Sequence, residues 1–194
     1  LHELSKASCK WDNVFIVGLP LLIKNRLYNC AAVIQKGQIK GIVPKACIPN
    51  NNEFYEKRWF REGGDLDTDY VSIFGEDIPC GLDLIFEDGE YSQLCFAIEI
   101  CEDLWIPIPP SSKKALDGAS IICNLSASNE IIGKHEYREM LVKSQSGRCI
   151  AGYLYSSSGV GESTTDLVFG GHAIIAENGI VLAQSERFRM ESQL

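Results

Sequence analysis

The apolar residues of this chain fall into short runs that are closed by glycine, asparagine or proline, and this pattern limits the folds open to it. Runs of about four to eight apolar residues suit β-strands better than helices. In residues 166–184, Asn178-Gly179 separates two such runs and predicts a β-hairpin. Lys36-Gly37 predicts a second hairpin earlier in the chain. Because the strands of a hairpin are antiparallel, a purely parallel sheet is excluded.

Outside the two predicted hairpins, segments typical of strands alternate with segments typical of helices. Residues 92–101 read SQLCFAIEIC, and their apolar character predicts a strand that is buried on both faces. Residues 133–148 predict an amphipathic helix, and further strands are expected over 13–20, after Gly118 and over 149–158. Together these segments predict an α/β fold with mixed sheets. The side chains expected on one side of the helix are those of Tyr137, Met140, Leu141 and Ser144.

Length and composition are those of a soluble globular protein. The 194 residues are most simply one domain, and 45% of them are hydrophobic and 23% charged. The net charge of −8 disfavours nucleic acid or an anionic membrane as a partner, because both require a basic face. No apolar run reaches the roughly 20 residues that span a bilayer, and the N-terminal stretch lacks the apolar core of a signal peptide. We therefore expect a cytoplasmic protein that binds neither nucleic acid nor membrane.

The eight cysteines are spaced unlike those of a zinc or redox site. No pair is separated by the two residues that zinc knuckles and thioredoxin-like motifs require, so no metal site is predicted. Several cysteines lie inside apolar runs such as NCAAVI and IICNL, where a thiol behaves as a small core side chain. Most of these cysteines are therefore expected to be structural.

Cys101 stands apart because the apolar run CFAIEI gives way there to Glu102-Asp103 and a proline-rich loop. Enzymes of the α/β class place catalytic groups at the carboxyl ends of buried strands. Acidic neighbours disfavour a thiolate, so a nucleophilic thiol here needs a base or a cation nearby. Lys45, directly after the apolar run GIVP, is the candidate cation, and Glu53 is a carboxylate that would hold its ammonium. The alternatives are a core thiol, a solvated lysine and a surface carboxylate.

Four segments in the same order resemble motifs of the nitrilase superfamily in its NAD-synthetase branch. VPKACIPNNNEFYEKRWF (43–60) is similar to the lysine motif, and EICEDLWIPIPPS (99–111) to the cysteine motif. NLSASNEIIGKHEYREML (124–141) resembles the substrate-pocket segment, and GESTTDLVFGGHAII (161–175) also fits this branch. The resemblance covers nearly the whole chain and implies a nitrilase-like αββα sandwich.

The resemblance also implies the roles of individual residues. Cys101 matches the nucleophile, Lys45 the triad lysine, and Glu53 a second glutamate that supports the lysine. Four further residues match positions that contact a glutamine substrate: Glu102, Ser128, Lys134 and the pocket-wall aromatic Phe54. Lys134 replaces a residue that is often arginine, and Asn51 stands where an aromatic is common. A lysine lacks the bidentate fork of arginine, so that contact is weaker.

The implied activity is hydrolysis of glutamine by a Cys-Lys-Glu mechanism. The ammonia would serve an ATP-dependent synthetase domain that amidates deamido-NAD to NAD, and ATP and Mg would bind only in that domain. No cofactor is expected in residues 1–194 themselves. Glutamine, the synthetase domain of the same parent chain and a second copy in a homo-oligomer are the implied partners.

The triad glutamate of the family matches no position in residues 1–44, and the first methionine is Met140. We therefore expect residues 1–194 to form an incomplete, N-terminally truncated glutaminase domain. The strand that carries the general base would precede it, and the synthetase domain would follow it. The segment alone is expected to be inactive.

Three alternatives remain open at this stage. A Cys-His dyad using His135 or His172 would follow papain-like logic. An amidase or carbamoylase of the same superfamily would act on another small amide. A catalytically silent assembly module would use the fold without the chemistry.

Overall fold

The computed structural model of the chain describes residues 1–193. These residues form two compact units, one from Leu1 to Leu84 and one from Ile85 onward. Each unit has its own sheets and its own hydrophobic core. Both combine strands with helices, as the sequence predicts, and both contain antiparallel strand pairs.

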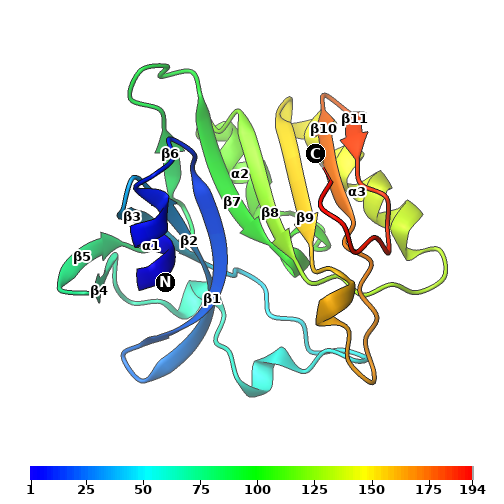
Figure 1. The fold of residues 1–194 in the computed structure, drawn as a ribbon, viewed down its shortest axis with the longest axis horizontal. Coiled ribbons are helices and arrows are strands. Elements are labelled where there is room, and N and C mark those ends of the chain that lie inside the picture. Colours follow the sequence, from blue (N-terminus) through cyan, green and yellow to red (C-terminus); the bar gives the residue numbers. More distant parts are fainter. Residues whose placement is uncertain (194) are drawn as a thin grey trace. The chain divides into compact units, whose positions relative to one another are not determined.

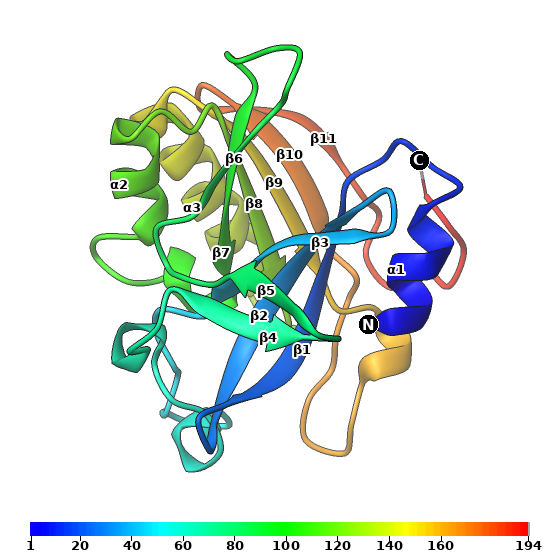
Figure 2. The same cartoon turned by 90° about the vertical axis from the view of Figure 1, so that its left-hand side faces the viewer.

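The first unit is built on a three-stranded antiparallel sheet in the order β1-β2-β3 (Figure 2). Its core is formed by buried residues that include Cys30, Ala32, Ile34 and Ile42. Between β3 and β4 the chain forms two short 3-10 helices, Glu56–Arg58 and Gly63–Asp65. In chain order the other elements are α1 (His2–Ser8), β1 (Phe15–Ile23), β2 (Arg26–Gln35), β3 (Gln38–Pro44), β4 (Tyr70–Ile73) and β5 (Glu76–Pro79).

The tight turns of this unit use left-handed backbone conformations. The predicted turn at Lys36-Gly37 joins β2 to β3, with φ values of 48° and 82°. The turn at Lys24-Asn25 joins β1 to β2 and has φ values of 45° and 63°. Positive φ at both central residues is the type I′ geometry that matches the twist of the flanking strands. The predicted strand over 13–20 is therefore one arm of a hairpin that the sequence analysis did not predict.

The second unit contains a six-stranded mixed sheet in the order β11-β10-β9-β8-β7-β6. Strands β7, β8 and β9 are parallel, whereas β6, β10 and β11 join the sheet antiparallel. Two helices, α2 and α3, cover one face of this sheet (Figure 1). The elements are β6 (Ile85–Glu87), β7 (Cys95–Ile100), α2 (Pro110–Leu116), β8 (Ile121–Ser126), α3 (Lys134–Cys149), β9 (Gly152–Ser157), β10 (Ala173–Glu177) and β11 (Ile180–Gln184).

Helix α3 forms where the sequence predicts it, and of the residues expected on one side only Leu141 packs against the core described for this unit. Tyr137 and Met140 are 49% and 52% exposed. The buried residues of α3 are instead Arg138, Val142, Gln145 and Ser146. Three of these are polar, and they are buried because each has hydrogen-bond partners within the unit. Hydrophobic periodicity therefore predicts the helix, whereas most of the residues that the helix buries are polar and are not indicated by that pattern.

Across residues 1–193, every helix is too short or too polar to pass through a lipid bilayer.

Candidate functional site

Cys101 lies at the end of β7, where the strand turns into a short 3-10 helix, Cys101–Leu104. Its backbone is left-handed, with φ at +50°. For a residue with a Cβ this conformation costs roughly 1–2 kcal/mol, so surrounding contacts must hold it. Strained backbone of this kind concentrates at functional sites. The sequence-predicted nucleophile is thus also one of the strained residues of its unit.

Two side chains hold the backbone at this turn. Asp103 is buried, and its Oδ2 accepts the Ile100 N–H at 2.9 Å. The Oδ1 of Asn124, on the neighbouring strand β8, accepts the Cys101 N–H at 3.3 Å. Successive amides of the turn are therefore bound to two different side chains, which offsets the cost of the left-handed residue.

A buried tyrosine lies beside the Cys101 thiol. Burial and the neighbouring Cys101 raise the pKa of Tyr155 to about 12, while Arg138 acts in the opposite direction. The Tyr155 hydroxyl therefore stays neutral at ordinary pH. The hydroxyls of Ser126 and Ser128 lie close to it, so the thiol of Cys101 has polar neighbours in this unit.

Ser128 is fixed by an arginine that the sequence analysis did not single out. Arg138 is fully buried, and its Nη2 donates to the Ser128 Oγ at 3.2 Å and to the Asn129 carbonyl at 3.3 Å. Its Nη1 pairs with Glu130 Oε1 at 2.8 Å. Arg187 donates to the other oxygen of Glu130 at 3.1 Å. The expected substrate-binding serine is therefore part of a buried ionic network.

Lys134, the first residue of α3, lies beside the same segment. Its ammonium donates to Asn129 Oδ1 and sits 5.4 Å from the centre of the Trp105 ring. A cation over an indole face is attracted by the ring quadrupole. Trp105 in turn packs against Tyr137, with 5.5 Å between ring centres. These contacts give Lys134 a defined position within the second unit.

The histidines of the second unit have other partners. The Nδ1 of His172 lies 3.0 Å from Arg138 Nη1, and its Nε2 lies 3.4 Å from Gln184 Oε1. Because arginine only donates, Nδ1 is the acceptor and Nε2 carries the proton. Burial and the charge of Arg138 lower the pKa of His172. His135 lies beside Glu136, with 3.8 Å between Nε2 and Oε1. These contacts give no support to the Cys-His alternative.

Lys45 follows β3 directly and has a side chain that is 1% exposed. Its backbone is fixed on both sides: Lys45 N–H donates to the Asn29 carbonyl at 2.8 Å, and the Lys45 carbonyl accepts the Gly63 N–H at 2.8 Å. The ammonium lies 2.9 and 3.1 Å from the two carboxylate oxygens of Glu56. A buried ammonium requires such a partner, since an unpaired one would be strongly destabilising.

Glu56 was not named by the sequence analysis, which assigned the supporting role to Glu53. Glu53 lies in the turn closed by the hydrogen bond from Phe54 N–H to the Asn51 carbonyl, 2.9 Å long. Glu56 begins the 3-10 helix that follows. The two carboxylates are only three residues apart, and Glu53 was preferred through the family resemblance alone. The supporting role of Glu53 and the substrate contacts of Phe54 and Glu102 remain predictions.

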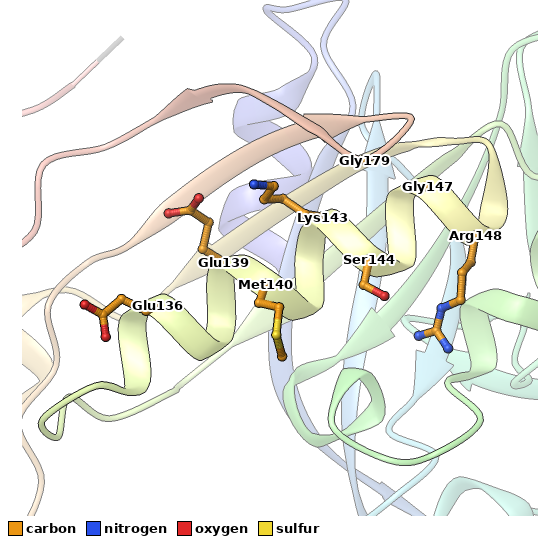
Figure 3. Close-up of a pocket in the computed structure, with 8 residues that line it drawn as sticks. All are labelled: Glu136, Glu139, Met140, Lys143, Ser144, Gly147, Arg148 and Gly179. Carbon is orange, nitrogen blue, oxygen red and sulfur yellow. The ribbon is translucent and has the colours of Figure 1, made fainter.

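A separate hollow of about 650 Å³ lies on the outer surface of α3 (Figure 3). Figure 3 shows that its side chains come from α3 itself, while Gly179 belongs to the turn between β10 and β11. The hollow is open and contains none of the predicted catalytic or substrate-binding residues. It is lined by Glu136, Glu139, Met140, Lys143, Ser144, Gly147, Arg148 and Gly179.

Comparison with known proteins defines the class to which these features belong. Residues 1–192 match the family model of the carbon-nitrogen hydrolases, and the chain belongs to this family. Within it, the chain is homologous to the glutamine-dependent NAD(+) synthetases. It is 45% identical over 188 residues to the synthetase of Mycobacterium tuberculosis, with 97% of this chain covered. It is 30% identical over 196 residues to the human synthetase, with 98% of this chain covered. It spans 28% of the length of both relatives.

Solved structures agree with this placement. The glutamine-dependent NAD(+) synthetase from Cytophaga hutchinsonii superposes with a TM-score of 0.84 at 25% identity, over 97% of this chain and 30% of that one. A carbon-nitrogen hydrolase from Helicobacter pylori shares the fold, with a TM-score of 0.72 at 23% identity over 94% of this chain and 61% of that chain. The nitrilase-like fold expected from the sequence is thereby confirmed.

Proposed function

We propose that this chain is the glutamine-hydrolysing part of a glutamine-dependent NAD(+) synthetase, with Cys101 as its nucleophile. The observation that carries the proposal is the strained Cys101 at the end of β7, in a chain whose relatives are synthetases of this kind. A thiol at a strand end, held in a left-handed turn by two side chains, suits nucleophilic attack. The family match over residues 1–192 supports the same chemistry.

In the proposed reaction, a base removes the thiol proton and the Cys101 sulfur attacks the side-chain amide carbon of glutamine. The Lys45 ammonium and the Glu102 N–H stabilise the oxyanion of the tetrahedral intermediate. The intermediate collapses to a thioester as the proton passes to the leaving nitrogen and ammonia departs. Water then attacks the thioester, which releases glutamate and restores the thiol. This scheme requires the ammonium of Lys45 to meet the thiol in the working enzyme.

The proposed destination of the ammonia is an ATP-dependent synthetase that amidates deamido-NAD. The names of the relatives support this assignment, and their greater length leaves room for a second activity. The substrate-binding residues proposed for glutamine are Glu102, Ser128, Lys134 and Phe54. Lys134 and Ser128 both lie next to Asn129, which supports their acting on the same ligand.

Covalent labelling tests the proposal directly. The full-length protein is treated with an electrophilic glutamine analogue, and the modified peptide is identified by mass spectrometry. We expect labelling at Cys101, and we expect Cys101→Ala to abolish both the label and ammonia release from glutamine. Cys95→Ser is the matched control, because Cys95 is a thiol at the other end of the same strand. It should retain labelling and activity.

Two outcomes would contradict the proposal. Ammonia release that survives Cys101→Ala would remove Cys101 as the nucleophile. Faster turnover of another small amide than of glutamine, in a panel assayed with the unaltered protein, would place the chain with the amidases of the same superfamily.

A further inference from the structure

Asn124 connects the turn at Cys101 to a buried chain of hydrogen bonds. It lies in β8, in register with Glu99 of β7 and Tyr155 of β9. Its side chain is almost fully buried. Its Oδ1 accepts the Cys101 N–H at 3.3 Å and the Ser126 hydroxyl at 2.7 Å. The amide therefore has to present its oxygen, and not its nitrogen, toward the cysteine.

The orientation of that amide is determined from its other end. Asn124 Nδ2 donates to the Tyr153 hydroxyl at 3.1 Å. The Tyr153 hydroxyl in turn donates to Glu99 Oε1. The second oxygen of Glu99 accepts the Ser111 N–H at 2.9 Å. Because a carboxylate only accepts, Tyr153 must donate to it and receive from Asn124. Each of these hydrogen bonds then has one allowed direction. If the Asn124 amide were flipped, its nitrogen would face the Cys101 N–H, and two donors would meet.

Burial keeps the donor and the acceptor of each of these hydrogen bonds fixed. Tyr153 is 0% exposed and Glu99 is 1% exposed, so water does not compete for these hydrogen bonds. Burial, and then the charge of Glu99, raise the pKa of Tyr153 well above its ordinary value. The tyrosine therefore remains a hydroxyl donor throughout the pH range in which the protein would work.

We propose that Asn124, oriented by Tyr153 and Glu99, is a positioning residue that holds Cys101 in its left-handed, reactive conformation. The inference rests on the proposed function, because it takes Cys101 as the nucleophile.

The test is a pair of substitutions in the full-length protein, with glutamine as the substrate. Tyr153→Phe keeps the ring but removes the hydroxyl that orients the amide, and we expect kcat to fall about tenfold. Asn124→Leu removes the acceptor itself, and we expect a fall of about 100-fold, typical of a misplaced reactive group. In both variants KM for glutamine should stay within about twofold, because neither side chain is proposed to bind substrate. The rate of Cys101 labelling should fall with kcat.

A general loss of stability would not lower kcat and the rate of Cys101 labelling together in the folded protein. Ser146→Ala is the matched control, since Ser146 is also buried and its hydroxyl donates to the Lys143 carbonyl and accepts the Gly179 N–H, each at 3.0 Å. It should lower the unfolding temperature and leave kcat unchanged. Labelling is scored by mass spectrometry on the folded fraction, so a partly unfolded variant still gives a result.

The failure of the inference differs from the failure of the proposed function. If Cys101→Ala is inactive while Tyr153→Phe and Asn124→Leu both keep the unaltered kcat, the positioning role is wrong and the nucleophile stands. If KM rises while kcat is unchanged, Asn124 acts on substrate binding and the positioning role is also wrong. If Cys101→Ala remains active, the proposed function itself fails.

Discussion

At the scale of single residues, the most consequential side chain outside the predicted set is Arg138. It is 0% exposed, and it joins Glu130, Ser128 and the Asn129 carbonyl. A buried ion pair adds little net stability compared with apolar packing, yet removal of one partner leaves an uncompensated charge. The contribution of Arg138 is therefore best measured as the decrease in the free energy of unfolding when it is replaced.

We predict that Arg138→Met lowers the free energy of unfolding by about 3 kcal/mol, because Glu130 loses its buried partner and retains its pair with the partly exposed Arg187. Urea titration followed by circular dichroism measures this change. Arg189→Met is the matched control in the same unit, since Arg189 pairs with Glu186 at the exposed surface and its loss should cost less than about 1 kcal/mol. Equal effects of the two substitutions would mean that the buried network contributes nothing specific.

At the scale of elements, the link between β3 and β4 depends on one glycine. Gly63 N–H donates to the Lys45 carbonyl at 2.8 Å. A Cβ on Gly63 would lie 2.8 Å from that carbonyl oxygen and 2.7 Å from Leu82 Cδ2. Contacts this short cannot be accepted without a shift of the backbone that carries Lys45.

We predict that Gly63→Ala destabilises the protein by about 1–3 kcal/mol and lowers kcat, because the segment that fixes Lys45 must move. Gly64→Ala is the control at the next position, where an added Cβ would meet nothing within 4 Å. It should change the free energy of unfolding by less than about 0.5 kcal/mol. Thermal unfolding and glutamine turnover are measured on both variants, so that their stability and their kcat can be compared. A Gly63→Ala protein as stable and active as Gly64→Ala would contradict the prediction.

A structural element can be predicted from the sequence when the residues that determine it are close together in the chain. The turns at Lys36-Gly37 and Asn178-Gly179 were predictable, because glycine adopts positive φ without steric cost. The turn at Lys24-Asn25 was missed because it has no glycine. The burial of Arg138 in α3 was also missed, since its partner His172 is distant in sequence. The position of Cys101 at the end of a strand was predictable, because the apolar run before it is visible in the sequence.

At the scale of the whole molecule, the eight cysteines are distributed over both units, so their reactivity can be used to follow the unfolding of each unit. All are free thiols. Burial and the neighbouring Cys80 raise the pKa of Cys30 to about 12, and burial raises the pKa of Cys80 to about 11. Both belong to the core of the first unit. Burial likewise raises the pKa of Cys123, in the second unit, to about 11. These three thiols are poorly reactive in the native state, because the thiolate is the reactive form.

Pulsed alkylation across a urea gradient therefore follows the unfolding of each unit through its own thiols. We predict that Cys30 and Cys80 become reactive at the same urea concentration, because they lose one shared core when the first unit unfolds. Cys9 is exposed and should react at every urea concentration, which controls for the reagent. Mass spectrometry of the digested protein assigns each label, and Cys123 gives the transition of the second unit independently. If Cys30 reacted at a lower urea concentration than Cys80, the two thiols would not share one cooperative core.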